Sequence, residues 1–177
     1  GVLLSCVLIL FGLIPTHAGE WAETRRIGRI VVASEMRLDR FVGIVNIIQQ
    51  QEADILATLD LPATQSPIEI YIFSNRRSYA EFVGRQAPEA INRRAAFAKN
   101  EDGINRVFIY LHNEFEVDLR HELTHAVLHA TLPFVPLWLD EGLAEYFEVL
   151  PEDRPSKNPH QARLKWAIKL FWKPNLE

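Results

Sequence analysis

Apolar residues recur every three or four positions in the segment 35–59. This spacing places them on one face of a helix, so it predicts a long amphipathic helix with Ser34 as its N-cap. The residues of this face are Phe41, Ile44, Val45, Ile48, Ile55 and Leu59. The segment LPATQSP, residues 61–67, contains two prolines and ends the predicted helix.

Three other segments have the composition of strands. RRIGRIVVA (25–33) and IEIYIFS (68–74) are rich in β-branched and aromatic residues. The stretch from 94 to 112 predicts a hairpin, because two apolar runs flank Asp102-Gly103, a pair favoured in tight turns; its second strand covers 106–111. A short helix is expected over 75–83, with Gly84 as its C-terminal cap.

The last strand leads into a helix predicted over 115–131, with Asn113 and Glu116 as its capping box. Pro133 and Pro136 separate it from another helix. PEDRPSKNPH (151–160) is expected to be a linker and 160–172 a final helix. The order of these elements predicts an α+β fold, with a small mixed sheet packed on helices.

The composition indicates one domain and argues against nucleic-acid binding. A chain of 177 residues that is 48% hydrophobic buries one sizeable core. Its formal charge of −4 lacks the broad positive field that phosphate backbones require.

The N-terminal stretch resembles a secretory signal. Residues 2–14 are apolar and uncharged, and a turn ending in small residues follows up to Ala18. We therefore expect a signal peptide over 1–18, incomplete at its start, and an exported protein without a stable membrane anchor after cleavage. Residues 19–177 are expected to be one domain, either complete or truncated at its C-terminus. The single cysteine, Cys6, lies in the signal, so any metal would have nitrogen and oxygen ligands.

The sequence HELTH (121–125) lies within the helix predicted over 115–131. At about 100° per residue, His125 lies about 40° and Glu122 about 100° around the axis from His121, so the three side chains share one quadrant. Two imidazoles at positions i and i+4 can converge on one Zn²⁺, and the neighbouring glutamate can reach a water on that ion. The opposite side of the helix is apolar and comprises Leu119, Leu123, Ala126, Val127 and Ala130.

A third ligand is predicted on the helix that follows Pro136. Glu141 and His125 each lie five or six residues from the loop, which places both roughly 8 to 9 Å from it. The two side chains are therefore level if the helices fold back on each other. Three protein ligands leave one position for water, as in catalytic zinc sites. The alternative is a metal-free helical hairpin with a solvated polar face.

HELTH followed by WLDEGLAEYFE (138–148) resembles the gluzincins, the zinc peptidases with an H-E-x-x-H motif whose third ligand is a glutamate on the next helix. The strand, helix, strand and hairpin order over 25–111 is similar to that of small bacterial gluzincin-like domains of the MA peptidase clan. The resemblance implies a zincin-like fold with an active-site helix and a third-ligand helix. It also implies the zinc ligands His121, His125 and Glu141, with Glu122 as general base.

The chain also departs from the better-known branches of that family. Only fifteen residues separate His125 from Glu141, fewer than in the thermolysin and aminopeptidase branches, and no G-x-M-E-N-like segment lies upstream. We therefore expect a zinc metallopeptidase that cleaves internal bonds of a peptide or protein substrate. The alternative is a zinc-binding module without catalysis that serves as a scaffold or peptide-binding domain.

Three more residues near the motif have two readings each. Glu145, one turn after Glu141, either accepts a ring N–H from a histidine ligand or is a solvated acid. His129 either lines the pocket or replaces a ligand. Asp118 is either a group that supports the ligands or an acid of the first helical turn.

The resemblance suggests other features whose residues it leaves open. Tyr146 and Glu148 match the end of the motif without an assigned role. An oxyanion-stabilising Tyr or His is expected beyond the third ligand in such enzymes, and His160 is the only histidine there. The strand 106–111 is expected either to be a sheet edge that pairs with an extended substrate or to be an ordinary strand.

Overall fold

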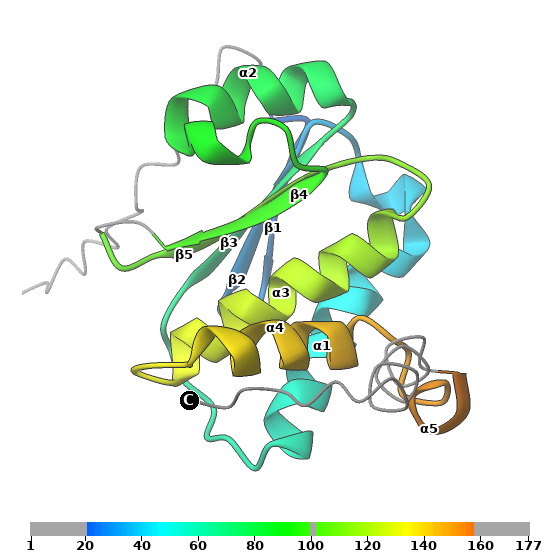
Figure 1. The fold of residues 1–177 in the computed structure, drawn as a ribbon. Coiled ribbons are helices and arrows are strands. Elements are labelled where there is room, and N and C mark those ends of the chain that lie inside the picture. Colours follow the sequence, from blue (N-terminus) through cyan, green and yellow to red (C-terminus); the bar gives the residue numbers. More distant parts are fainter. Residues whose placement is uncertain (1–20, 100–101, 158–177) are drawn as a thin grey trace, which may run out of the picture.

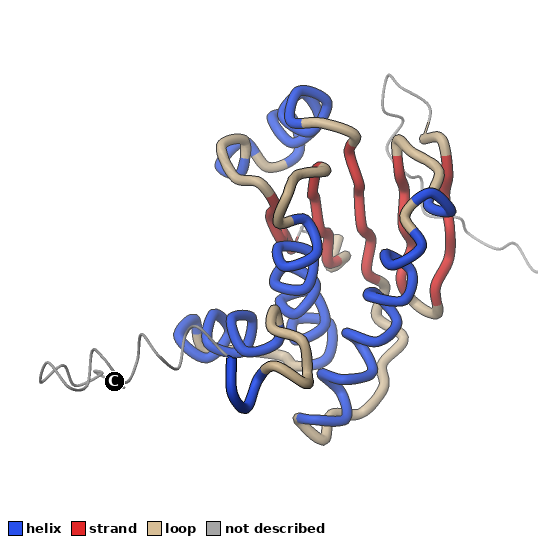
Figure 2. Tube along the Cα trace, turned by 90° about the vertical axis from the view of Figure 1, so that its right-hand side faces the viewer, coloured by secondary structure: helices blue, strands red, loops and turns tan. Residues whose placement is uncertain are grey.

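The computed structural model describes residues 21–99 and 102–157, which form an α+β fold around one mixed sheet (Figure 1). The strands lie side by side in the order β1-β2-β3-β5-β4 (Figure 2). Their bounds are β1 (Glu23–Ile27), β2 (Ile30–Ser34), β3 (Ile68–Phe73), β4 (Ala95–Lys99) and β5 (Asn105–Tyr110). The helices are α1 (Val42–Thr58), α2 (Arg76–Gln86), α3 (Phe115–Thr131), α4 (Leu137–Phe147) and α5 (Arg154–Lys157), with 3-10 turns η1 (Leu38–Arg40) and η2 (Pro88–Ala90).

The three central strands are parallel and the two outer strands are antiparallel to their neighbours. β3 pairs in parallel with β2 and β5, whereas β1 pairs with β2 and β4 with β5 in antiparallel fashion. The predicted strand at 68–74 and the predicted hairpin are confirmed. The strand 106–111 lies inside the sheet as β5, so its interpretation as an edge was wrong and the alternative, an ordinary strand, is confirmed; the edges are β1 and β4.

The segment 25–33 is a hairpin of two strands and not the single strand that we expected. Ile27 and Ile30 face each other across a two-residue turn of Gly28 and Arg29. Gly28 has a φ of 59°, a left-handed conformation that glycine adopts without steric cost. The β-branched composition fits both strands equally well, so only this glycine indicated the turn.

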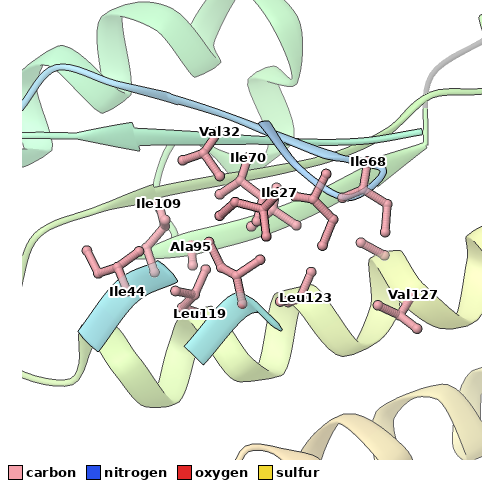
Figure 3. Packing of buried hydrophobic residues seen from close by; sticks show 14 of the residues in the cluster. Ile27, Val32, Ile44, Ile68, Ile70, Ala95, Ile109, Leu119, Leu123 and Val127 are labelled. Atoms are coloured by element: carbon pink, nitrogen blue, oxygen red, sulfur yellow. The ribbon is translucent and has the colours of Figure 1, made fainter. Parts of the chain in front are cut away.

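Helices cover both faces of the sheet, and strand side chains alternate between the two layers. Ile68, Ile70 and Ile72 of β3 point toward α1 and α3, where they meet the buried face of α3 (Figure 3). Tyr71 and Phe73 point to the other face, where α2 packs. This period of two follows from the pleat of a strand. The layer under α2 is rich in aromatic rings, whereas the layer under α3 is mainly aliphatic.

Helix α1 begins seven residues later than predicted. Ser34 ends β2, and its hydroxyl accepts a hydrogen bond from the Met36 N–H, which stabilises a turn and does not cap a helix. The Leu38 N–H donates to the Glu23 carboxylate, so η1 is held to β1 before α1 starts. Ile44, Ile48 and Ile55 of the predicted helical face are buried in the core, and Phe41, Val45 and Leu59 are partly buried against it.

Helix α2 begins at its predicted place but continues past Gly84. The Asn75 side chain caps its start by accepting from the N–H groups of Arg77 and Ser78. The helix ends at Gln86 because Ala87 precedes Pro88, and a residue before proline is disfavoured in helical conformation. Gly84 lies inside the helix, so its prediction as the C-terminal cap was wrong; a Cβ there would make an ordinary contact with the Ile91 side chain at 3.4 Å.

The predicted boundaries of α3 are confirmed, as is the helix after Pro136. The capping box was wrong: the N-cap of α3 is Glu114, without a side-chain cap, and its N–H donates to His112 Nδ1. The predicted linker after Leu150 contains the short helix α5. The predicted signal (1–18), the predicted helix 160–172 and His160 lie outside the described residues. None of the described helices has the length and apolar character that crossing a membrane requires.

The buried face of α3 should dominate the stability of this fold. We expect Leu123→Ala, at a fully buried position, to lower the free energy of unfolding by about 2–5 kcal/mol because it leaves a cavity between α3 and the sheet. The matched control is Leu137→Ala, at a position that is 75% exposed, with an expected change within about 0.5 kcal/mol. Urea denaturation of both variants measures the difference; equal losses would contradict this packing.

Candidate metal centre

Helix α3 buries one side in the core and presents the other to α4. Leu119, Leu123 and Val127 are fully buried against the sheet, as their helical positions predict. His121 and His125 point away from that face, toward α4, which packs on α3 (Figure 1). The turn between the helices is short, and Pro136 is the N-cap of α4.

Glu141 of α4 meets both histidines. Its Oε2 lies 3.7 Å from His121 Nε2, and its Oε1 lies 3.9 Å from His125 Nε2. One ligand atom from each of the three residues lies within 4.8 Å of the other two. His125 is buried while the Glu141 side chain is 54% exposed, so the centre opens to solvent on the α4 side. The structure therefore brings together the three residues that were predicted as metal ligands.

The other ring nitrogen of each histidine faces a carboxylate. His121 Nδ1 donates a hydrogen bond to Glu148 Oε2 at 2.8 Å. His125 Nδ1 lies 2.9 Å from Asp140 Oδ1, although the two are not aligned as a hydrogen bond and have no other such partner within the described chain. Carboxylates in these positions fix the ring orientation and tautomer, which directs both Nε2 atoms toward Glu141.

Asp140 connects the centre to His129 and to β4. Its second oxygen, Oδ2, accepts a hydrogen bond from His129 Nε2 at 3.0 Å. The Phe97 ring of β4 stacks on His129 at 5.2 Å and on His125 at 6.0 Å between ring centroids. His129 is not one of the three residues whose ligand atoms converge. It contacts Asp140 and Phe97, so it lines the centre, as one of its two readings predicted.

Glu122 is buried between α3 and β4, with 9% of its surface exposed. Burial raises the pKa of Glu122 above its usual value. The charge that His121 and His125 carry when protonated, and the backbone N–H of Phe97, which donates to this carboxylate, act in the opposite direction. A carboxyl group in this setting can both accept and release a proton, which is what proton transfer requires.

A groove of about 640 Å³, which we call the β4–α3 groove, runs along these residues. Asp118 lies in it but contacts other groups than the histidine ligands: its Oδ2 is 3.0 Å from Arg94 Nε and 3.4 Å from His112 Nε2. Burial raises the pKa of Asp118, whereas Arg94 and His112 lower it. The lining residues are Asn92, Arg93, Arg94, Ala95, Glu114, Val117, Asp118, His121, Glu122 and Glu148.

The sequence interpretation missed both carboxylates that hold the ligand rings. We considered Glu145, one turn after Glu141, for this position, but the acids at the two Nδ1 atoms are Glu148 and Asp140. Glu148 lies seven residues after Glu141, and a spacing of seven residues places two side chains on nearly the same face of a helix, two turns apart. Helical spacing could therefore have identified Glu148 from the sequence. Asp140 directly precedes Glu141, and no spacing rule distinguishes it. Tyr146, whose role the sequence left open, packs against Arg154: the guanidinium carbon lies 5.0 Å from the centre of the Tyr146 ring.

No protein-family model matches the chain, and no curated protein matches its sequence. The geometry of the centre and the chemistry of its residues therefore carry the functional argument.

Proton binding to His121 should compete with metal binding. Burial lowers the pKa of His121, but the hydrogen bond that His121 donates to Glu148 and the charges of Glu122, Glu148 and Glu141 outweigh it, so the net shift is upward. Because a metal requires the neutral ring, we expect Zn²⁺ affinity to fall as the pH decreases through this pKa, which lies above the ordinary histidine value. Chelator competition at a series of pH values on both sides of it measures this fall. An affinity independent of pH would exclude His121 as a ligand.

The two supporting carboxylates should determine metal affinity without being ligands. Glu148→Gln and Asp140→Asn are expected to weaken Zn²⁺ binding by about 10- to 100-fold, because the ligand rings lose their orienting partners. Glu145→Gln, on the same helix, serves as the matched control and should leave the affinity nearly unchanged. Isothermal titration with Zn²⁺ compares the three variants, and a larger loss at Glu145 than at Glu148 would reverse the assignment.

Proposed function

We propose that the protein is an exported zinc-dependent metallopeptidase of gluzincin type with a zincin-like fold. The observation that carries this proposal is the convergence of His121, His125 and Glu141, with Glu122 buried beside them. Export rests on the signal-like composition of residues 1–18. Peptide hydrolysis rests on the pairing of this centre with the H-E-x-x-H sequence.

The donor set fits zinc in type, number and orientation. Two imidazole nitrogens and one carboxylate oxygen are ligands that Zn²⁺ binds in catalytic sites. Donors around a tetrahedral zinc with bonds of about 2.0–2.1 Å lie roughly 3.3 Å apart. The distances of 3.7 and 3.9 Å from Glu141 to the two rings need only a small contraction to reach that value.

Glu122 is proposed as the residue that moves protons. A zinc ion in such a centre supplies a Lewis acid and lowers the pKa of water toward about 7. The Glu122 carboxylate, held by the Phe97 N–H, would take a proton from that water and later deliver it to the leaving amine. Its burial beside the groove keeps it away from bulk solvent and within reach of a bound peptide.

The outer edge of β4 is proposed to bind the peptide backbone. β4 pairs with β5 on one side, and its Phe97 N–H points instead to Glu122. Because backbone groups alternate in direction along a strand, those of Ala95 should leave on the same side as Phe97, toward the β4–α3 groove. An extended substrate can add to this edge as a further strand, a common mode of peptide recognition. Such binding favours internal bonds over a free amino terminus.

The alternative is a zinc-binding domain that has lost catalysis and serves as a scaffold or peptide-binding module. Both candidates require the same three ligands. Glu122 distinguishes them, because a scaffold gains nothing from a buried carboxylate beside the metal ligands, and burying it costs free energy. This residue favours the enzyme.

The decisive experiment separates metal binding from turnover at Glu122. We expect one zinc per chain in the wild type and in Glu122→Gln, whereas kcat/KM for a quenched-peptide library should fall by about 10²- to 10⁴-fold in the variant. Chelation should abolish cleavage by the wild type, and added Zn²⁺ should restore it.

Glu116→Gln, on the exposed surface of α3, is the matched control and should retain activity. Bound zinc without cleavage of any library member would favour the scaffold. Full activity of Glu122→Gln would refute its role as general base.

A further inference from the structure

Arg93 lines the β4–α3 groove and forms no ion pair with a carboxylate among the described residues. The acids around it have other partners: Arg94 pairs with Glu114 and Asp118, and His121 pairs with Glu148. Arg93 itself makes no side-chain hydrogen bond or ion pair with any other residue of the described ranges, and its side chain is exposed. An exposed arginine that lines a groove presents five donors to whatever the groove binds.

The backbone around Arg93 is held in place. Its N–H donates to the Ala90 carbonyl at 2.9 Å, and the same carbonyl accepts from the buried Tyr79 hydroxyl at 3.1 Å. Arg93 therefore belongs to a fixed turn between η2 and β4. β4 is the edge strand of the sheet that packs against α3 (Figure 1). Burial raises the pKa of Glu122, and Arg93 is among the groups close enough to lower it.

The direction of β4 decides which part of a bound peptide reaches Arg93. Phe97 marks the level of the metal ligands, since its ring stacks on His125. Arg93 precedes Phe97 by four residues and lies at most roughly 13 Å away along the strand direction. A peptide that pairs antiparallel to β4, the slightly more stable arrangement, extends its C-terminal part toward Arg93. The distance corresponds to two to four residues beyond the cleaved bond.

We propose that Arg93 is a specificity-determining residue that binds a carboxylate on the C-terminal side of the cleaved bond. The ligand is the terminal carboxylate of a short peptide or an acidic side chain at that position, because a guanidinium binds both through charge-assisted hydrogen bonds. This inference rests on the proposed function. It adds a substrate class: peptides that are acidic, or that end, within about four residues after the cleaved bond.

The test measures binding of defined peptides to the full chain carrying Glu122→Gln and loaded with Zn²⁺. Mass spectrometry of wild-type products first locates the cleaved bond in a neutral peptide. Fluorescence anisotropy then measures the affinity for four versions of that peptide. Two are its C-terminal amide and its free acid, and the other two are amides that carry Glu three residues after or three residues before the cleaved bond. We expect the free acid or the downstream Glu to bind about tenfold more tightly than the neutral amide.

The variants assign that preference to one side chain. Adding Arg93→Gln should reduce the ratio of acidic to neutral affinity to about one, and Arg93→Lys should retain part of it. Arg77→Gln, at an 89% exposed position on α2, is the matched control and should keep the full ratio. Circular dichroism verifies that each variant is folded.

The outcomes separate this inference from the proposed function. Cleavage of neutral peptides without an acidic preference, a preference for the upstream Glu, or a preference that survives Arg93→Gln would overturn the role of Arg93 and leave the peptidase intact. If no peptide is bound or cleaved, the proposed function fails and the role of Arg93 with it. The free acid and the internal Glu distinguish the two sources of the carboxylate.

Discussion

The packing of α3 between the sheet and α4 determines where every candidate site residue lies. Leu119, Leu123 and Val127 bury one side of α3 against the aliphatic face of the sheet, and this fixes the rotation of the helix about its axis. His121 and His125 are then forced to face α4, and Glu122 is forced to face β4. Since interiors are close-packed, this rotation changes only if the core is repacked. The core of the fold thereby orients the ligands.

The charges of the centre explain why it should need a cation. Glu122, Asp140, Glu141 and Glu148 lie around the rings of His121, His125 and His129, so the centre holds more carboxylates than imidazoles. A divalent ion bound by His121, His125 and Glu141 would add positive charge to this acidic cluster and couple its own binding to the folding of α3 and α4. Beyond the centre, the acids of the groove pair with Arg94 and His121, which leaves Arg93 without an ion pair among the described residues.

The periodicity of apolar residues predicted most helices and strands correctly, but it predicted their ends and the order of the strands in the sheet less well. The spacing of apolar residues identified α1 and α3, and the alternation of strands identified β3 and the β4–β5 hairpin. The sequence did not reveal that β5 lies inside the sheet, because strand order depends on long-range packing and not on local pattern. Gly28 occupies a left-handed turn whereas Gly84 lies within α2, so glycine alone did not distinguish a turn from the interior of a helix.

The three candidate ligands could be predicted from the sequence because they obey helical spacing on two adjacent helices. Their supporting acids did not, because Asp140 and Glu148 are recognised only once α3 and α4 are placed side by side. Helical position was also an insufficient guide for Asp118. Its place on α3 suggested that it supports the candidate ligands, yet its closest ionic partner is Arg94, from the turn before β4.

The attachment of α4 has a consequence for how an ion would enter and leave. α4 makes most of its contacts with α3, and its C-terminal end is tied down by Gln51, which donates to the Phe147 carbonyl, and by Arg120, which donates to that of Glu148. At its N-terminal end Leu137 and Trp138 are exposed, and the first side-chain hydrogen bond that holds the helix there is that of Asp140 with His129. Local opening of a helix end costs less than global unfolding. Loss of the Asp140 contact would let Glu141 move away while both imidazoles stay on α3, so that exchange of the ion need not disturb the sheet.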